Sequence, residues 1–219
     1  QGEGQRSPRA ETPRIAHLVQ AGDCRPVARL VQQVLGEPDQ RVADRDGMRV
    51  RVVGCSGGRK ALRLDGDRLR PDPVSRFQPA GPHGPSMVID PFAYEWQVAE
   101  WPPPTSRPDV VYEMHVGTFS PEGTWTGALA RLPWLAGLGV TMLEVMPVAE
   151  LPGRWNWGYD GVGLYASAHM YGDADSFKRF VDEAHRRELG VILDVVYNHL
   201  GPDGNYLPAF SEEYFTDRY

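Results

Sequence analysis

Three apolar segments separated by two helix-like segments constrain the fold of this chain most strongly. The segments VVYEMHV (110–116), VTMLEVMPV (140–148) and VILDVV (191–196) are typical of strands buried on both faces. The stretches 126–139 and 175–189 carry apolar residues at helical spacing. Strands and helices that alternate over short links predict parallel strands with right-handed crossovers. The sequence therefore predicts an α/β fold, and a doubly wound sheet and a barrel both begin in this way.

Both predicted helices carry start and stop signals. Pro133 is expected to kink or shorten the first helix, and Gly139 is expected to end it. Asp175 is a candidate N-cap for the second helix, which Gly190 would end. Each helix therefore has predicted boundaries that a structure can test.

Charged residues in the second helix recur four positions apart. Asp182 with Arg186, and Glu183 with Arg187, are expected to form ion pairs on a solvent-exposed face. Glu144 lies inside the second strand and is expected to be a buried structural carboxylate. Neither prediction implies a catalytic role.

The part of the chain before residue 110 has a different pattern. MRVRVV and KALRLDGDRL alternate between apolar and polar residues, and Gly57-Gly58 and Asp65-Gly66 supply turns, which predicts a β-hairpin or the remnant of a small β-sandwich. The prolines in the stretch 71–109 argue against a helix or a central strand there. Its aromatic residues predict that the stretch packs against the rest of the protein. Residues 1–47 are uncertain, partly disordered or in short helices. The predicted divisions are 1–47, 48–109 and 110–219.

Composition excludes several classes of function. The chain has 219 residues and a net charge of -6 without a basic run, so we expect no nucleic-acid partner. No apolar run approaches the ~20 residues of a membrane span, and no signal peptide is recognisable, which favours a cytoplasmic protein. Cys24 and Cys55 have no metal-ligand spacing. We therefore expect neither a metal site nor a cofactor.

Polar residues at the end of the third strand predict the location of a site. Asn198 and His199 follow that strand, and function in both kinds of parallel α/β fold sits at the carboxyl ends of strands. Neither G-x-G-x-x-G nor a P-loop follows the first strand, which argues against dinucleotide or phosphate binding. The segment GRWNWGYDGV (153–162) adds clustered aromatics, which suit the C–H faces of a sugar ring. Loops of this kind also simply cover a core, so both interpretations remain open.

The same motifs resemble a known family. DVVYNH (194–199) is similar to the first signature region of the α-amylase superfamily of glycoside hydrolases, whose catalytic domain is a (β/α)8 barrel. YEMHVGTFSPEGTW, MPVAELPGRWNWGYDGV and DVVYNHLGPDGNY together resemble the maltooligosyltrehalose trehalohydrolases, which release trehalose from maltooligosyl trehalose in trehalose biosynthesis. The resemblance covers about residues 48–219. It implies the first three strands of a partial (β/α)8 barrel, preceded by a truncated β-sandwich-like domain.

The resemblance also implies substrate-binding residues. His199 would hydrogen-bond a hydroxyl of the sugar whose bond is cut, and Tyr159 would stack on that sugar. Asp160 and Trp157 would line the same subsite. The expected ligand is a maltooligosaccharide or maltooligosyl trehalose.

Two further residues have implied supporting roles. Asp194 would hold an arginine that precedes the catalytic nucleophile, which explains a carboxylate in an apolar strand. Asn198 binds calcium in many amylases, but trehalohydrolases are not generally calcium enzymes, so we assign it to hydrogen bonding. Glu113 and His115 are expected to face the barrel interior without a catalytic role.

The catalytic carboxylates are expected elsewhere. A retaining glycosidase needs a nucleophile and a general acid/base, and the resemblance implies that these groups and a third Asp come from later strands. We therefore predict a fragment that has no catalytic residue and is inactive alone. The alternatives are a non-catalytic α-glucan-binding protein, a fragment of a glycogen branching enzyme or another α-amylase relative, and one half of a split enzyme.

Overall fold

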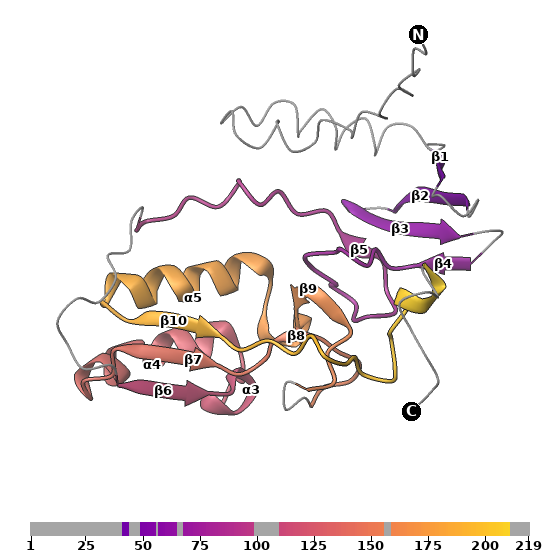
Figure 1. Ribbon diagram of the computed structural model, residues 1–219. Coiled ribbons are helices and arrows are strands. Elements are labelled where there is room, and N and C mark those ends of the chain that lie inside the picture. The colour runs from indigo at the N-terminus through magenta and orange to yellow at the C-terminus, as the bar shows by residue number, and fades with distance from the viewer. Residues whose placement is uncertain are drawn as a thin grey trace, which may run out of the picture. The chain divides into compact units, whose positions relative to one another are not determined.

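The computed structural model describes residues 41–43, 49–55, 57–64, 68–98, 110–155 and 159–210 (Figure 1). The predictions for residues 1–40, for Trp157 and for the C-terminal segment 211–219 lie outside these ranges. Within the described part, no helix is both long and apolar enough to cross a membrane.

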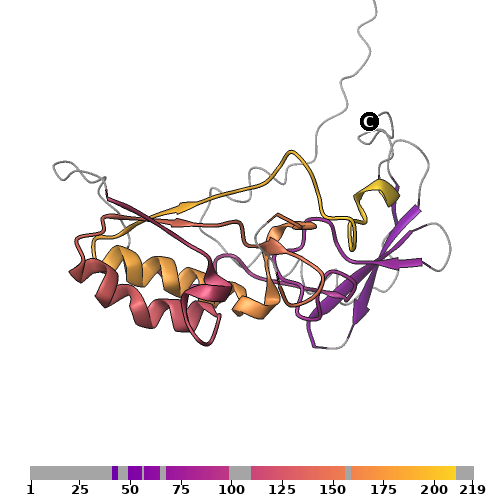
Figure 2. The same ribbon diagram turned by 90° about the horizontal axis from the view of Figure 1, so that it is seen from below.

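A parallel three-stranded sheet is the centre of the α/β part. The strands β6 (Val111–Met114), β7 (Met142–Val145) and β10 (Gly190–Leu193) pair in the order β10-β7-β6, both pairs parallel. The helices α4 (Trp125–Gly137) and α5 (Ala174–Arg186) form the connections between them. Figure 2 shows both helices on the same face of the sheet. The predicted α/β fold with parallel strands is confirmed.

The core lies between this sheet and the two helices. Trp125, at the start of α4, is fully buried and stacks on Phe177 of α5, with 4.3 Å between ring centroids and 12° between the planes. Phe180 packs against the same indole ring at 5.3 Å. Leu132 of α4 and Leu143 of β7 are also fully buried. Each such side chain stabilises the fold by about 1.5–3 kcal/mol relative to exposure.

The C-terminus of α4 is a Schellman motif. Gly139 has φ 85°, its N–H donates to Ala136 O at 3.1 Å, and the N–H of Val140 donates to Leu135 O at 3.3 Å. Gly139 therefore ends the helix, as predicted. The expected shortening at Pro133 is wrong, because α4 continues through it to Gly137. The proline side chain is exposed, so water can reach the backbone groups that it leaves unpaired.

The predicted ends of α5 need correction. Asp173, and not Asp175, is the N-cap, and its carboxylate accepts a hydrogen bond from the N–H of Ser176 at 2.7 Å. At the other end Glu188 adopts φ 59°, and the N–H of Leu189 donates to Ala184 O at 2.9 Å. The helix thus ends in a second Schellman motif with a non-glycine residue in the left-handed conformation, and Gly190 begins β10 instead.

One of the two predicted ion pairs forms. Arg187 bonds Glu183 at 2.7 Å, whereas Arg186 also turns to Glu183, at 2.8 Å. Asp182 is only 3% exposed and forms no pair with Arg186 on a solvent-exposed face. This prediction failed because a sequence-distant segment covers that side of the helix.

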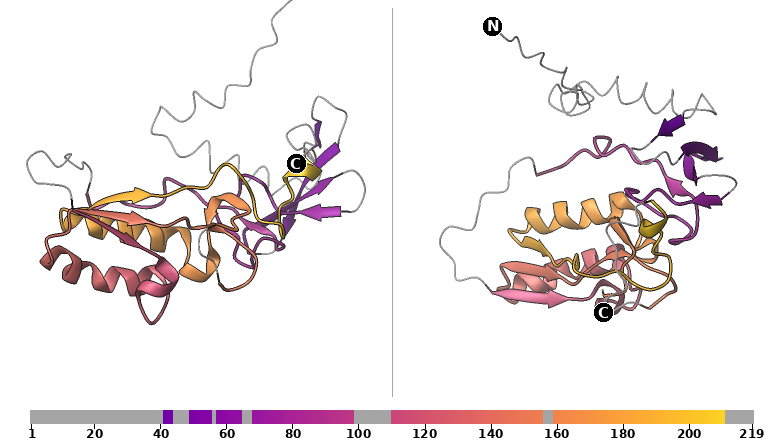
Figure 3. Two further views of the ribbon diagram at one scale, coloured as in Figure 1. Left: turned by 60° about the horizontal axis from the view of Figure 1, so that its bottom comes forward. Right: turned by 45° about the vertical axis from the view of Figure 1, so that its right-hand side comes forward.

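The covering segment is the irregular stretch that ends at residue 98, and Asp182 holds it. The Asp182 carboxylate accepts hydrogen bonds from Tyr94 Oη (3.1 Å), Gln97 N (2.9 Å) and Val98 N (3.0 Å). Figure 3 shows this stretch running alongside α5. The expectation that the proline-rich passage packs against the rest is confirmed for its described part.

Strand β10 is less buried than its composition suggested. Ile192 and Leu193 are each 40% exposed, and Val111 on the opposite edge strand is 48% exposed. The strand also ends at Leu193, so Asp194 follows it. The prediction of a strand buried on both faces is therefore wrong, because no described element covers the second face of this sheet.

An antiparallel sheet precedes the α/β part. It contains β1 (Arg41–Ala43), β2 (Arg49–Cys55), β3 (Arg59–Leu64) and β4 (Arg68–Arg70), paired in that order, and β5 (Ser86–Met87) pairs with β3. In the β2–β3 connection both Gly57 and Gly58 have positive φ (71° and 70°), a conformation that glycine adopts without a steric cost. The predicted hairpin is confirmed. Residues 41–43, assigned to a disordered or helical region, are a strand.

Short regular elements that the sequence pattern did not predict lie between β7 and α5. The strands β8 (Ala149–Glu150) and β9 (Gly163–Ser167) form an antiparallel pair, and the one-turn 3₁₀ helix η1 (His169–Tyr171) follows. The shorter elements α3 (Val116–Phe119) and η2 (Leu207–Ala209) were also not predicted. These pieces are too short to give a periodic signal.

Gly137, the last residue of α4, and Gly139, just after it, provide a matched test of the helix C-terminus. We expect Gly139→Ala to lower the free energy of unfolding by about 1 kcal/mol, because a β-carbon is unfavourable at φ 85°. Gly137→Ala should raise it by about 0.5–1 kcal/mol, because alanine favours the helical conformation. Neither new methyl group meets an atom within 4 Å, so sterics do not confuse the comparison. Denaturant unfolding measures both values, and equal effects of the same sign would contradict the assigned motif.

Asp182→Asn should destabilise the fold by about 1–3 kcal/mol at neutral pH, because a buried amide has one acceptor oxygen for three donors. Burial would raise the pKa of Asp182, but the N–H groups of Gln97 and Val98 and the Tyr94 hydroxyl hold it below the ordinary value. The carboxylate therefore stabilises the fold above pH ~4, and this contribution is lost as the pH falls further.

The unfolding free energy of the wild type should thus decline more steeply than that of the variant below pH ~4. Asp175→Asn is the control, since its half-exposed carboxylate contributes no more than about 0.5 kcal/mol. If the unfolding free energies of Asp182→Asn and the wild type changed in parallel with pH, the Asp182 carboxylate would not be what holds residues 94–98 against α5.

Candidate functional site

Two loops that follow neighbouring parallel strands meet at one edge of the sheet. His199 lies beyond the end of β10, and its Nε2 is 3.0 Å from the carbonyl oxygen of Tyr159, which lies between β8 and β9. A second bond joins the same loops, from Gly201 N to Gly161 O at 3.1 Å. The structure therefore brings together two residues that the sequence singled out 40 positions apart.

The hydrogen bond to Tyr159 assigns the tautomer of His199. A carbonyl oxygen only accepts, so Nε2 must carry the proton. In a neutral imidazole the other nitrogen, Nδ1, is then an acceptor. His199 can therefore accept a hydrogen bond from a ligand hydroxyl through Nδ1.

Close backbone approach explains the glycine at position 201. A β-carbon on Gly201 would overlap the carbonyl oxygen of Asp160. A β-carbon on Gly161 would lie 2.6 Å from Cβ of Ala149. The two loops touch through their backbones at Gly201, whereas Gly161 leaves room for the side chain of Ala149 in its own hairpin.

The side chains around this junction are open to solvent. Tyr159 is 48% exposed and Trp155 is 76% exposed, with the Arg154 guanidinium 5.2 Å from the centroid of the indole ring. Asp160 and Asn198 are exposed as well. The arrangement offers aromatic faces next to hydrogen-bonding groups on one surface.

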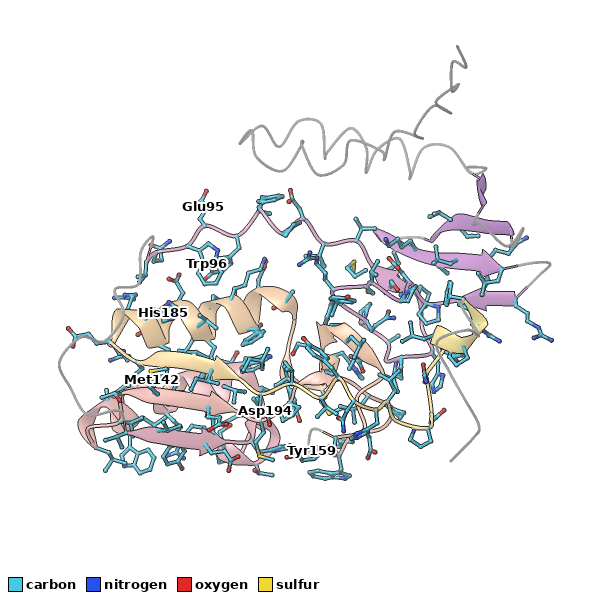
Figure 4. All side chains as sticks on the ribbon, in the orientation of Figure 1. Glu95, Trp96, Met142, Tyr159, His185 and Asp194 are labelled. Atoms are coloured by element: carbon cyan, nitrogen blue, oxygen red, sulfur yellow. The ribbon has the colours of Figure 1, made fainter. Side chains whose placement is uncertain are left out.

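Asp194 lies apart from the Tyr159–His199 contact. Its N–H donates to Val145 O at 2.9 Å, continuing the pairing of β10 with β7, and its side chain is half-buried. Figure 4 shows Asp194 on the segment after β10 and Tyr159 on the β8–β9 loop. Asp194 lines a separate cavity, whose lining includes Gly161 but neither Tyr159 nor His199.

This cavity, of about 230 Å³, is mostly apolar. It lies between β9, the first turns of α5 and the segment 193–197, and it also touches Ile89 and Pro91. Its charged borders are Asp194, Arg76 and Lys178. The apolar walls favour packing of another element over chemistry.

The loop after His199 is fastened to the antiparallel sheet region. His83 Nδ1 is 2.6 Å from Tyr206 Oη, and its Nε2 is 3.4 Å from a carboxylate oxygen of Asp203. The guanidinium of Arg70 lies 4.7 Å from the centroid of the Tyr206 ring. These contacts restrict the segment that carries His199.

The buried carboxylate of this region was missed by sequence reasoning. Glu144, predicted to be buried, is only half-buried, whereas Glu150 of β8 is 0% exposed. Glu150 bonds His169, to which no role was assigned. The signal that could have found it is a lone charge inside the apolar run VMPVAEL.

The polar residues of β6 form no comparable cluster. Glu113 is exposed and pairs in register with Glu144 of β7. His115 Nε2 lies 3.4 Å from Tyr171 Oη, whose pKa burial raises to about 12. Among the residues with described positions, no group of three or more His, Cys, Asp or Glu side chains could hold a metal ion.

Comparison with known proteins identifies similar sequences. The α-amylase catalytic-domain family matches residues 71–215. A malto-oligosyltrehalose trehalohydrolase of Saccharolobus solfataricus is 50% identical over 165 residues, which cover 73% of this chain and 29% of that protein. One of Rhizobium sp. is 51% identical over 148 residues, covering 67% of this chain and 25% of the relative.

A solved structure agrees with these sequence matches. The crystal structure of a putative α-amylase from Salmonella typhimurium aligns with a TM-score of 0.74 and 47% identity, covering 82% of this chain and 31% of that one. The resemblance to the trehalohydrolases is confirmed. The chain spans 29% and 25% of the length of the two trehalohydrolases it matches.

Gly201→Ala tests the contact between the two loops. The new methyl group would overlap the Asp160 carbonyl, so we expect a loss of about 1–3 kcal/mol in the free energy of unfolding. Gly54→Ala in β2 is the control, because its β-carbon meets nothing within 4 Å. Denaturant titration of both variants measures the difference. A Gly201→Ala protein as stable as the Gly54→Ala protein would show that the loops do not pack as described.

Proposed function

Because the chain belongs to the α-amylase family, we propose that it is the N-terminal part of a maltooligosyltrehalose trehalohydrolase. The observation that carries the proposal is 50% identity over 165 residues to a protein of that name. The meeting of Tyr159 and His199 at the carboxyl end of the sheet supports it independently. The complete enzyme would release trehalose from maltooligosyl trehalose.

We assign the parallel sheet to the first three strands of a (β/α)8 barrel. The strand order in space equals the order along the chain, and both connecting helices lie on one face. A doubly wound sheet has helices on both faces. In a barrel the second face turns inward, and the partly exposed Ile192 and Val111 would be covered by later strands.

The substrate site follows from the chemistry of the loop junction. The exposed ring of Tyr159 packs on the C–H face of a glucose unit. His199 accepts a hydrogen bond from a sugar hydroxyl through Nδ1, since Nε2 is held by the Tyr159 carbonyl. Asp160 and Trp157 line the same subsite.

The remaining assigned residues act indirectly. Asp194 holds an arginine from a later part of the enzyme, and Asn198 hydrogen-bonds within the strand end. The nucleophile and the general acid/base of a retaining mechanism would come from the part of the enzyme beyond these strands. The chain by itself then binds sugar without cleaving it.

A chimera tests the proposal directly. This chain's residues 71–210 would replace the matching segment of the Saccharolobus enzyme, and we expect the chimera to release trehalose from maltooligosyl trehalose. His199→Ala and Tyr159→Ala in the chimera should each lower kcat/KM about 10-fold or more, because a transition-state contact is lost. Released trehalose measures the rate.

Tyr165→Ala is the matched control, because this tyrosine of β9 is 63% exposed and lies outside the junction. It should leave kcat/KM within about twofold of the unmutated chimera. The isolated chain should give no trehalose above background. A folded chimera that forms branches in a glucan, or binds glucan without turnover, would favour a branching-enzyme or a non-catalytic origin.

A further inference from the structure

Glu150 is a buried charge that the proposed chemistry does not use. Its side chain is 0% exposed, and its two oxygens accept three hydrogen bonds. Oε2 accepts from the backbone N–H of His169 at 2.8 Å, and Oε1 accepts from the N–H of Leu151 at 3.2 Å. Oε1 is also 2.9 Å from Nδ1 of the His169 ring. One carboxylate therefore connects β8 to the turn that follows β9.

These contacts lie at the base of the loop that carries Tyr159. The loop leaves the hairpin after Glu150 and returns at Val162, whose N–H donates to the backbone oxygen of Glu150 at 2.7 Å. A β-carbon on Gly163 would lie 2.9 Å from Cβ of Glu150, so the returning strand packs directly on this residue. The position of Glu150 therefore determines where the loop begins and ends.

The returning part of the loop, next to Val162, is also held by the segment that carries His199. Gly161 O accepts from Gly201 N at 3.1 Å, one residue before Val162 bonds Glu150. Tyr159 O receives the His199 ring two residues earlier. Backbone hydrogen bonds of Val162 and Gly161 thus link Glu150, the residue that carries the buried carboxylate, to the segment that carries His199.

The energetics of the Glu150 contacts indicate that they orient the β8–β9 loop more than they stabilise the fold. Burial raises the pKa of Glu150, and the donors of His169 oppose that rise. A buried carboxylate with its partners is often no more stable than apolar residues of the same volume, whereas removing one partner is costly. The contacts of Glu150 do fix a geometry, because its two oxygens must face the N–H groups of Leu151 and His169.

We propose that Glu150 and His169 are positioning residues that hold the β8–β9 loop so that the Tyr159 carbonyl meets His199. The sugar-binding consequence rests on the proposed function, whereas the effect on loop geometry does not. Neither residue touches the ligand. Their effect reaches it through Val162, Gly161 and Gly201.

Glu150→Gln in this chain is the main test. An amide has one acceptor oxygen, so one of the two backbone N–H groups loses its partner. We expect hydrogen exchange of the Gly201 amide to accelerate about 10-fold or more, because its acceptor loop loosens. Exchange of the Met146 amide, which bonds Met114 O in the parallel sheet, should be unchanged. Affinity for maltotriose, followed by NMR titration, should fall about threefold or more.

Two further variants complete the design. His169→Ala keeps the backbone donor at 2.8 Å and removes only the ring, so the Gly201 amide should exchange about threefold faster. This variant decides the question if Glu150→Gln does not fold. Glu183→Gln, in α5, removes a carboxylate that pairs with Arg186 and Arg187 and should change neither amide nor the affinity.

A selective effect on Gly201 supports the proposal, and an equal change at Gly201 and Met146 overturns it, because that outcome shows a general structural role. Unchanged exchange at Gly201 also overturns it, as does faster exchange with unchanged maltotriose affinity. A wild-type chain that binds no maltotriose would count against the proposed function alone. The exchange rates would then still decide whether Glu150 and His169 set the loop geometry.

Discussion

Parallel pairing of β7 with its two neighbours is the constraint on which the site depends. Because β6, β7 and β10 point the same way, the chain leaves β7 and β10 at one edge of the sheet. The bond from Asp194 N to Val145 O extends this pairing past the last residue of β10. Segments 40 residues apart in sequence then start close together, and the contact of His199 with Tyr159 follows from that geometry. The buried Trp125 and its stacked partner Phe177 maintain it by joining the two helices that cover the sheet.

Two buried carboxylates hold segments without regular structure against the helices and strands. Asp182 accepts from Gln97 N and Val98 N, and Glu150 accepts from Leu151 N and His169 N. In both cases backbone donors that belong to no ladder are satisfied by one side chain. Their titration differs, since donors lower the pKa of Asp182, whereas burial raises that of Glu150. The regular elements are thus stabilised by apolar packing, and the segments around the site by ionic hydrogen bonds.

The sequence correctly predicted those elements of the fold whose signal lies within a few neighbouring residues. The apolar strands, the alternating hairpin β2–β3 and the stop at Gly139 all have signals within a few residues, and each is present. The burial of Asp182 has no such signal, because residues 94–98 approach it from more than 80 positions away. The hairpin β8–β9 has only two residues in its first strand, too few for any period. Motif resemblance singled out Tyr159 and His199, but it could not show that they meet through a backbone carbonyl.

That carbonyl contact changes how the site is understood. If the ring of His199 were free to turn, either nitrogen could meet a sugar hydroxyl, and the site would not distinguish donors from acceptors. With Nε2 bound to Tyr159 O, Nδ1 of the neutral imidazole remains as an acceptor for the proposed sugar hydroxyl. Tyr159, whose ring we propose to pack on the sugar, thus also orients the histidine through its backbone carbonyl. In the proposed site, recognition therefore depends on the loop's path as much as on its side chains, which is why Gly161, Gly201 and the buried Glu150 bear on it.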